Sequence, residues 1–238
     1  MSTHANEEKM TLELNSLIYH EMMSHPALFT HSHPHKILII GDGECGILNE
    51  VLKHEQVISA WQIEDNKKIL KHSQEHFPTI CGPNPDPRVK FYFQDYAKWI
   101  ASATPDFFDI IIISKELNEI APQFLEHCFA ALSSEGLLIQ QSISPFQLSE
   151  LKAIHAILQQ AGFRDTQTLH FPQPKFPSGW RMAWMATKRG VFRRISEKEI
   201  FNKPFKTRYY NFDIHKAALA LPEFIREELS AATAGETS

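Results

Sequence analysis

The sequence predicts an α/β fold, with a mostly parallel sheet flanked by helices, and three observations support this prediction. Short apolar runs alternate with segments of helical length along most of the chain, as in strand–helix–strand units with right-handed crossovers. The first apolar run ends in a glycine-rich turn at residues 41–46. Polar or acidic side chains follow the next two strands, and ligands of parallel sheets bind where the strands end.

Each expected strand is a short run of apolar residues bounded by turn residues. Five runs fit buried parallel strands, at residues 36–40, 57–63, 89–93, 109–113 and 136–140. After Gly162 the pattern changes. Two runs separated by a proline-rich loop predict an antiparallel pair, at residues 166–171 and 180–187.

Helices are expected between and after these strands. They cover residues 47–54, 65–76, 96–101, 122–132, 145–161 and 214–229, the last interrupted near Pro222. Residues 78–87 carry four prolines and a glycine and are expected to form a loop. Because both ends of the chain are polar, residues 1–10 are expected to be disordered and residues 231–238 to be a flexible tail. Residues 11–230 then form one domain.

Composition narrows the function classes. The chain has 238 residues, 43% of them hydrophobic, which is enough for one large domain with a substantial core. Its formal net charge of −4 argues against nucleic-acid binding, which needs a basic surface. No apolar run approaches the ~20 residues that span a bilayer, and the N-terminus lacks the apolar stretch of a signal peptide. The expected location is the cytoplasm.

Cysteine and histidine usage gives no sign of a metal site. Cys45, Cys81 and Cys128 are scattered and form no CxxC pair, so neither a disulfide framework nor a zinc site is expected. Residues 31–35 contain three histidines, but histidines on a loop bind a metal weakly unless the fold presents them together. No metal is therefore expected.

The strand ends carry the residues that bear on function. In the glycine-rich turn, Gly41 and Gly43 let the backbone approach a ligand, although a plain strand–helix connection would also explain them. The second strand ends near Gln62 and Glu64, where a side chain usually grips the ribose hydroxyls of a nucleotide; Glu64 fits by its charge and Gln62 by its register. Asp95 can accept a hydrogen bond from an adenine amino group or can cap the next helix. Together the strand ends favour a nucleoside ligand.

Further segments carry a family pattern along most of the chain. Besides the glycine-rich turn they are Gln141 and the segments at residues 18–22, 86–90, 209–211, 214–218 and 221–223. In these segments the chain resembles the polyamine aminopropyltransferase (spermidine synthase) family, as a divergent member, over roughly residues 11–230. The resemblance implies a methyltransferase-like, Rossmann-type fold. It also implies transfer of an aminopropyl group from decarboxylated S-adenosylmethionine to putrescine or a similar amine, with release of methylthioadenosine and no cofactor beyond this co-substrate.

The implied reaction makes definite physical demands. A sulfonium makes the adjacent methylene electrophilic, and a neutral primary amine displaces methylthioadenosine from it. Because an alkylammonium has a pKa near ~10, the amine is protonated at neutral pH. The site must therefore hold a cation, remove one proton and align nitrogen with carbon.

The resemblance carries several roles over to this chain. Four residues match substrate-binding positions, one on the nucleoside side and three on the amine side, and these are Asp95, Tyr19, His20 and Gln141. Glu44 replaces an aspartate of the family's glycine loop, so a carboxylate is kept there. The ribose-gripping glutamate of the family aligns with Gln62, which can hydrogen-bond but carries no charge.

The segment after the fourth strand departs most from the family. The resemblance places a catalytic aspartate at Ser114 and an amine-binding aspartate at Leu117. A serine hydroxyl is a poor base without an activating partner, and Lys115 adds a positive charge where the amine should bind. Glu116 and Glu119 are the candidates for a displaced carboxylate, in catalysis and in amine binding. The alternative is that both are solvated loop charges.

Two other departures concern the surroundings of the site. Phe176 aligns with a tyrosine that precedes Pro-Ser-Gly in some members. Members also carry a small N-terminal β-stranded module, whereas only 18 residues precede Tyr19 here, so this module is expected to be reduced or absent unless the gene start is misplaced. The expected partners are polyamine and nucleoside substrates and a second copy of the chain in a homodimer, with neither nucleic acid nor membrane.

Three functions are compatible with these observations. The chain is an active aminopropyltransferase with an altered amine pocket, a weakened pseudoenzyme that binds a nucleoside or polyamine, or an S-adenosylmethionine-dependent methyltransferase. The C-terminal signature argues against the third, because methyltransferases in general do not need it. Between the first two, the pattern favours the enzyme.

Overall fold

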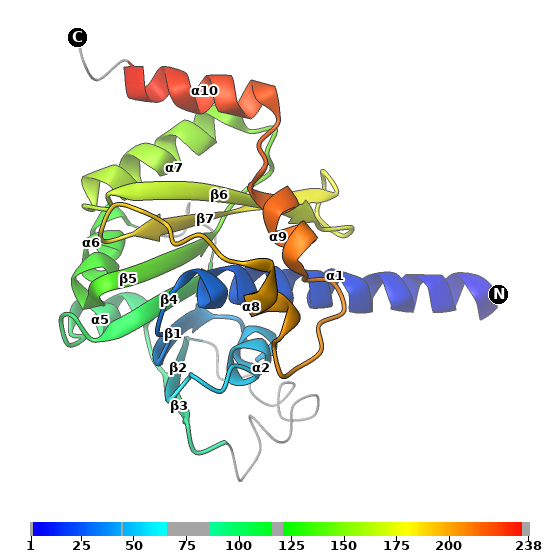
Figure 1. Ribbon diagram of the computed structural model, residues 1–238, viewed down its shortest axis with the longest axis horizontal. Helices are drawn as coiled ribbons and strands as arrows, with labels where there is room; N and C mark the ends of the chain where they lie inside the picture. Colours follow the sequence, from blue (N-terminus) through cyan, green and yellow to red (C-terminus); the bar gives the residue numbers. More distant parts are fainter. Residues whose placement is uncertain (1, 44, 66–85, 116–120, 235–238) are drawn as a thin grey trace.

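A seven-stranded sheet forms the centre of the computed structural model, which describes residues 2–43, 45–65, 86–115 and 121–234 (Figure 1). The strands are β1 (Lys36–Gly41), β2 (Ser59–Glu64), β3 (Val89–Phe93), β4 (Phe108–Ser114), β5 (Leu132–Gln141), β6 (Asp165–Pro172) and β7 (Trp180–Thr187). Their order in the sheet is β3-β2-β1-β4-β5-β7-β6. The first five strands run parallel, and β7 is antiparallel to β5 and β6.

This topology confirms the predicted methyltransferase-like, Rossmann-type α/β class. From β1 the sheet grows through β2 and β3 on one side and continues through β4 on the other. The strand order therefore reverses between β1 and β4, which is where sheets of this kind bind ligands. Gly41 and Ser114, the last residues of β1 and β4, stand opposite each other at that edge.

The strands have no polar face because both sides of the sheet are covered. Ile37 and Ile39 of β1 face one core cluster, and Leu38 and Ile40 face the other. All four side chains are fully buried. A continuous apolar run is what a parallel strand buried on both faces requires.

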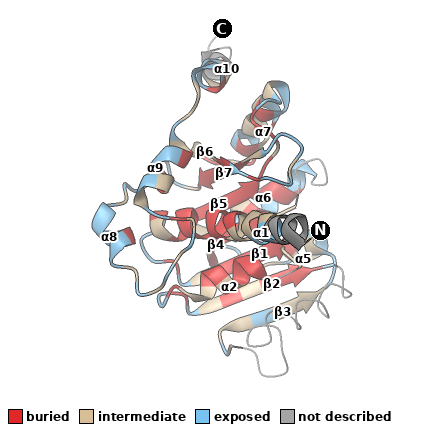
Figure 2. Ribbon diagram, turned by 90° about the vertical axis from the view of Figure 1, so that its right-hand side faces the viewer, coloured by how far each residue is buried: buried red, intermediate tan, exposed pale blue. Residues whose placement is uncertain are grey.

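Helices form the two outer layers of the molecule (Figures 1 and 2). One face is covered by α1 (Ser2–Thr30), α2 (Gly46–Leu52), α8 (Glu197–Phe201) and α9 (Phe212–Leu219). The other is covered by α5 (Tyr96–Ala101), α6 (Pro122–Ala131), α7 (Leu148–Gln160) and α10 (Glu223–Ala234). The expected helix over residues 214–229 is two helices separated by residues 220–222, so the break lies at Pro222 as expected.

The long helix α1 is the main element that the sequence analysis lacks. The sequence pattern predicts no element over residues 11–30 and disorder over residues 1–10, whereas Ser2–Thr30 form one helix. Within it, residues 21–28 are buried on all sides, including the polar Glu21, Ser24 and His25. A helix segment enclosed on every side shows no amphipathic pattern, so periodicity could not reveal it.

Some expectations lie outside the described residues. They concern most of the helix expected over residues 65–76 and the loop over residues 78–87. Before β1 the described part of the chain contains α1 and no strand. None of the described helices is long and apolar enough to cross a membrane.

Candidate active site

A cavity of about 470 Å³ opens at the edge of the sheet where β1, β2, β4 and β5 end. Its walls also include α1 and the loop between β6 and β7. Six residues that the sequence analysis proposes for the site line it, namely Tyr19, His20, Gly43, Glu64, Ser114 and Gln141. The fold therefore brings together residues from five separate segments of the chain.

The turn after β1 is held in a conformation that few residues adopt. Gly41, Asp42 and Cys45 have positive φ angles of 85°, 61° and 58°. A Cβ at Gly41 would also lie 3.2 Å from the Ser114 carbonyl oxygen, so both conformation and space favour glycine there. Asp42, which the sequence analysis did not single out, closes the turn by accepting a hydrogen bond at Oδ2 from the Ile47 N–H at 2.7 Å.

The two ribose candidates occupy different places on β2. Gln62 stands opposite Ile39 inside the sheet, and its Nε2 donates to the carbonyl oxygens of Gly41 at 3.2 Å and Asp42 at 2.8 Å. The Gln62 amide thus stabilises the glycine-rich turn through its backbone carbonyls. Gln62 itself does not line the cavity. Glu64 is the last residue of β2, is only 4% exposed and lines the cavity. Of the two side chains, Glu64 is the one that reaches the ligand space.

Lys115 lines the cavity beside Glu64. Its side chain packs against Gly41, and its Nζ lies 3.9 Å from Glu64 Oε1 and 3.4 Å from Asp65 Oδ1. The same ammonium is 5.6 Å from the ring centre of Tyr96. The charge of Glu64 is therefore compensated by a lysine that a bound ribose would have to displace or share.

Asp95 lies at the N-terminus of α5 and acts there as a helix cap. Its Oδ1 accepts hydrogen bonds from the Ala97 N–H at 2.9 Å and the Lys98 N–H at 3.0 Å. The side chain is exposed and does not line the cavity. Of the two roles expected for Asp95, the structure contains the helix cap, and its second carboxylate oxygen takes no part in the cap.

A chain of hydroxyl and amide groups forms the wall opposite Glu64. The Tyr19 hydroxyl donates a hydrogen bond to Gln141 Oε1, and its oxygen lies 2.7 Å from Ser114 Oγ. Because the tyrosine hydrogen points to Gln141, Ser114 donates its own hydrogen to Tyr19. The lone pairs of Ser114 Oγ then remain as acceptors for a substrate N–H.

His20 fills the space between α1 and the start of α2. A Cβ on Gly46 would lie 2.0 Å from a His20 ring carbon, so no side chain is tolerated at Gly46. His20 Nε2 is 3.7 Å from Asp42 Oδ1. Burial lowers the pKa of His20 to about 4, so the ring is neutral at physiological pH and acts as a hydrogen-bonding group.

Three predicted site residues are not described by the structure, and two charged cavity residues were not predicted. Glu44, Glu116 and Glu119 lie outside the described residues. Lys175 and Arg181 line the cavity without having been predicted from the sequence as site residues. A sequence signal for Arg181 exists, because it is a charged residue within the otherwise apolar run of β7, where a buried strand would not place it without a reason.

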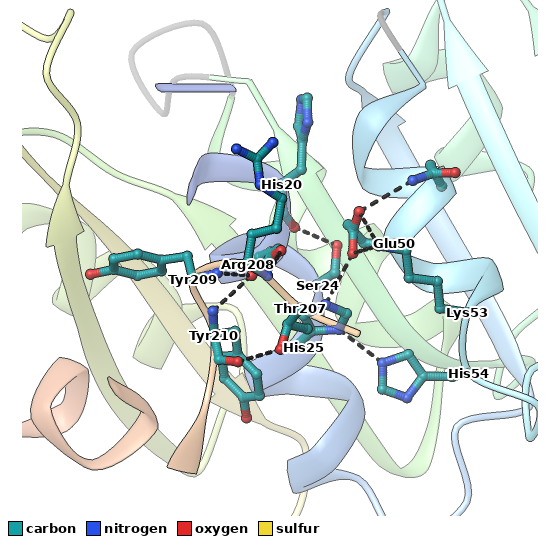
Figure 3. A network of polar contacts seen from close by, with 12 residues as sticks. His20, Ser24, His25, Glu50, Lys53, His54, Thr207, Arg208, Tyr209 and Tyr210 are labelled. Atoms are coloured by element: carbon teal, nitrogen blue, oxygen red, sulfur yellow. Dashed lines mark hydrogen bonds and ion pairs between the residues drawn. The ribbon is translucent and has the colours of Figure 1, made fainter. Parts of the chain in front are cut away.

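A polar network behind the cavity anchors α1 to the C-terminal segment (Figure 3). Glu21 accepts three backbone hydrogen bonds, from the N–H groups of Arg208 at 2.8 Å, Tyr209 at 2.9 Å and Tyr210 at 2.7 Å. Tyr209 and Tyr210 belong to the C-terminal pattern noted in the sequence. That pattern therefore serves to hold the helix that carries Tyr19.

A second part of this network joins α1 to α2. His25 contacts His54 through Nδ1 at 2.9 Å and Glu50 through Nε2 at 3.1 Å. Lys53 donates to the same carboxylate at 2.6 Å. Burial alone would raise the pKa of Glu50, but the hydrogen bonds from His25 and Lys53 outweigh it and lower the pKa. Glu50 is thus ionised, and it fixes the two helices that flank the glycine turn.

The described residues contain no group of three or more His, Cys, Asp or Glu side chains that could hold a metal ion. Cys128 is a buried free thiol, and burial raises its pKa. Cys45, next to the cavity turn, is also buried.

The sheet topology defines a class of protein, the Rossmann-type α/β proteins with a methyltransferase-like fold. A methyltransferase of this kind from Archaeoglobus fulgidus superposes with a TM-score of 0.51 at 16% identity, covering 68% of this chain and 89% of that one. At this identity the similarity concerns the fold.

Closer matches define the family. The model of the spermine/spermidine synthase domain matches residues 16–196. The polyamine aminopropyltransferase of Thioalkalivibrio sulfidiphilus is 43% identical over 229 residues, covering 92% of this chain and 81% of the relative. Spermidine synthase from Thermotoga maritima superposes with a TM-score of 0.80 at 28% identity, covering 90% of this chain and 75% of that one. The chain belongs to the spermine/spermidine synthase family and is an enzyme of the aminopropyltransferase type.

Proposed function

We propose that the protein transfers the aminopropyl group of decarboxylated S-adenosylmethionine to a primary amine and releases methylthioadenosine. The observation that carries the proposal is the single cavity shared by Glu64 and Gly43 with Tyr19, Ser114 and Gln141. Glu64 and Gly43 lie at the end of β2 and just after β1, on one side of the point where the strand order reverses. The other three residues line the cavity from α1, β4 and β5. Donor and acceptor can therefore meet at the edge of β1 and β4.

On the donor side, the proposed roles follow from position and charge. Gly41 and Gly43 allow the backbone to approach the nucleoside, and Glu64 accepts hydrogen bonds from the ribose. Glu44 is assigned to the donor by the family pattern. Asp95 accepts a hydrogen bond from the adenine amino group at Oδ2, the carboxylate oxygen that is not part of the helix cap. No cofactor beyond the co-substrate takes part.

On the acceptor side, the chain of Ser114, Tyr19 and Gln141 orients the attacking nitrogen. The amine donates an N–H to Ser114 Oγ. This hydrogen bond turns the lone pair of the amine nitrogen toward the methylene beside the sulfonium. The nitrogen–carbon bond forms while the carbon–sulfur bond breaks and its electron pair stays on sulfur. Before this step the substrate ammonium loses one proton to water, because only the neutral amine has a lone pair to attack with; the secondary ammonium that forms stays protonated at neutral pH.

Ser114 holds the nitrogen in place but is a weak base. A positioned general base contributes about 10²–10⁴ to the rate, and none of the described side chains that contact Ser114 supplies one. We therefore propose slow turnover in which alignment provides most of the acceleration. Glu116 and Glu119 are the carboxylates proposed to assist, in proton removal and amine binding respectively.

We propose that the reaction takes place in the cytoplasm and that the chain acts as a homodimer. Its partners are small-molecule substrates and not nucleic acid. The net charge of −4 supports only the last part, the absence of nucleic acid, because a surface that binds nucleic acid would be basic.

The test is to incubate the purified protein with decarboxylated S-adenosylmethionine and a series of primary amines, and to measure methylthioadenosine by chromatography. We expect release that depends on the amine. Tyr19→Phe should lower kcat at least 10-fold, because it breaks the hydrogen-bond chain to Gln141. Tyr92→Phe, on β3 outside the cavity, is the matched control and should leave kcat unchanged.

One alternative is favoured by the serine at position 114, namely a nucleoside-binding protein without turnover. Calorimetry with methylthioadenosine separates the two functions. Binding without product from any amine would support the binding protein and overturn the proposed enzyme. Methyl transfer from S-adenosylmethionine would overturn both.

A further inference from the structure

The side chain of Lys115 connects the ends of two strands that are not neighbours in the sheet. Lys115 directly follows β4, and β1 separates β4 from β2. Its stem passes over Gly41 at the end of β1, since a Cβ at Gly41 would lie only 3.2 Å from Lys115 Cε and 3.3 Å from its Cγ. The ammonium reaches the end of β2, where Nζ lies 3.9 Å from Glu64 Oε1. The absence of a side chain at Gly41 is what opens this path.

Only the backbone end of Lys115 is firmly held. Its carbonyl oxygen accepts a hydrogen bond of 2.6 Å from Gln140 Nε2, and Gln140 is fully buried in β5. The ammonium stands at the end of a flexible stem and is held by charge, by Glu64 and by Asp65 Oδ1 at 3.4 Å. The backbone of Lys115 is therefore fixed, whereas its ammonium can change partner.

The ammonium and a bound ribose compete for the same carboxylate. Glu64 is buried and is the residue of β2 that reaches the cavity, and its Oε1 already accepts a hydrogen bond from the Asp65 N–H at 3.0 Å. A largely desolvated carboxylate attracts an ammonium more strongly than an exposed one does. The ribose of methylthioadenosine offers only neutral hydroxyl groups in return. A ribose that binds Glu64 must therefore break this ion pair.

Two groups next to Glu64 can receive the ammonium once it leaves. The side chain of Asp65 is 44% exposed, against 5% for that of Glu64. The ring centre of Tyr96, the first residue of α5, lies 5.6 Å from Lys115 Nζ, within the range of a cation–π contact. Neither Asp65 nor Tyr96 lines the cavity. An ammonium that shifts to these two groups keeps a charge partner and frees Glu64 for a ligand.

We propose that Lys115 is a latch on the donor side of the cavity and sets the affinity for the nucleoside. It pairs with Glu64 in the nucleoside-free protein, and a bound nucleoside displaces it toward Asp65 and Tyr96. The inference rests on the donor site of the proposed function. Because part of the binding free energy is used to open the latch, donor and methylthioadenosine bind less tightly than they would without the lysine. The latch thereby weakens retention of the product.

The substitution Lys115→Met tests the latch directly, because methionine keeps an unbranched side chain and removes the charge. Calorimetry measures the Kd of methylthioadenosine for the full chain and for the variant. We expect the Kd to fall by about 5-fold or more in Lys115→Met. A higher Kd would show that Lys115 holds the nucleoside, and an unchanged Kd that the two do not compete. Either result would overturn the proposal.

The matched control is Lys152→Met. Lys152 also forms an ion pair, with its Nζ 2.6 Å from Glu228 Oε1, but it lies outside the cavity. Its substitution should leave the Kd of methylthioadenosine unchanged. A similar fall of the Kd in both variants would assign the effect to the net charge of the protein and would reject the latch.

Salt provides a second signature that needs no substitution. Methylthioadenosine is uncharged at neutral pH, whereas the ion pair between Lys115 and Glu64 is weakened by screening. Raising NaCl from about 50 mM to about 500 mM should therefore lower the Kd of the parent chain about 2-fold, and that of Lys115→Met by less. A direct effect of salt on the nucleoside would appear in both proteins. The same salt dependence in both would contradict a latch.

These measurements separate the latch from the proposed function. If methylthioadenosine binds to neither the parent chain nor Lys115→Met, the donor site is wrong and the latch with it. If it binds both with the same Kd, and decarboxylated S-adenosylmethionine with an amine gives product, the transfer reaction stands and only the latch is rejected. Tighter binding by Lys115→Met without product from any amine would support the latch in a nucleoside-binding protein that has no turnover.

Discussion

At the residue scale, Asp95 shows how one carboxylate can carry two duties. One of its oxygens caps α5 by accepting from two backbone N–H groups. The proposed adenine contact uses the other oxygen. Asparagine caps helices about as well as aspartate, so the two duties can be separated by one substitution.

Asp95→Asn should keep the stability of the protein while weakening its affinity for methylthioadenosine. With its one oxygen in the cap, asparagine presents an NH₂ group to the adenine amino group and cannot accept its hydrogen bond, so we expect the Kd to rise about 10-fold, or ~1.4 kcal/mol. Calorimetry gives the affinity and thermal unfolding gives the stability. Asp213→Asn, at an exposed position, is the control. An unchanged Kd would leave Asp95 as a helix cap alone.

Individual site residues were predictable where a strand end or a family position marked them. Glu64, Ser114 and Gln141 all lie at the ends of strands that the apolar runs predict, and all line the cavity. Gln62 shows the limit of this reasoning. It lies only two residues before Glu64, and the register with β1 places it beneath the turn, where its amide binds backbone.

At the scale of elements, α1 depends on a contact far away in the sequence. Glu21 accepts hydrogen bonds from three successive N–H groups at residues 208–210. These backbone groups would otherwise lack partners next to a buried helix, which is costly. The C-terminal segment and the helix that carries Tyr19 therefore stabilise each other.

Glu21→Gln should loosen this junction. A glutamine offers one acceptor oxygen and turns an NH₂ group toward backbone N–H groups, so at least one hydrogen bond is lost. We expect the free energy of unfolding to fall by about 2 kcal/mol, with faster amide exchange at residues 208–210. Denaturant unfolding and hydrogen exchange measure the two effects. Glu227→Gln on the exposed side of α10 should change neither; the same exchange rates in both variants would contradict the assigned role.

The elements themselves were mostly predictable. Six of the seven strands and the short helices α2, α5 and α6 match the expected segments closely, since strands buried on both faces give continuous apolar runs and glycines or prolines mark their ends. The strand β5 begins at Leu132, four residues before the start expected at Gly136. The long helix α1 was not, because its buried segment contains polar side chains that are satisfied only by partners such as Arg208–Tyr210 backbone and Glu50.

At the scale of the whole molecule, buried histidines link stability to pH. Burial lowers the pKa of both His20 and His215 to about 4, and it also lowers the pKa of His25 and His54. In the unfolded chain a histidine has a pKa near ~6.5. Between these values the unfolded state binds more protons than the folded state. Stability is therefore complete above about pH 6.5 and is lost as the pH falls toward 4.

The denaturant midpoint should accordingly fall between pH 7.5 and pH 5.0. His215→Gln can keep a hydrogen bond with the Tyr210 hydroxyl, which lies 2.9 Å from His215 Nδ1, but it does not titrate, so its midpoint should depend less on pH. His33→Gln, at an exposed position, should behave like the parent chain. Equal slopes for His215→Gln and the parent would show that His215 is not one of the linked groups.

The sequence by itself determined the parallel sheet, the glycine-rich turn and the side of the sheet where a ligand binds. These follow from local patterns, since strand periodicity and turn residues act over a few neighbours. Only the tertiary structure decided that Glu64 rather than Gln62 reaches the cavity, that Lys115 lies against Glu64, and that Arg181 stacks beside Tyr19. Those contacts join distant segments, and their geometry depends on strand register and helix packing, which no local pattern encodes.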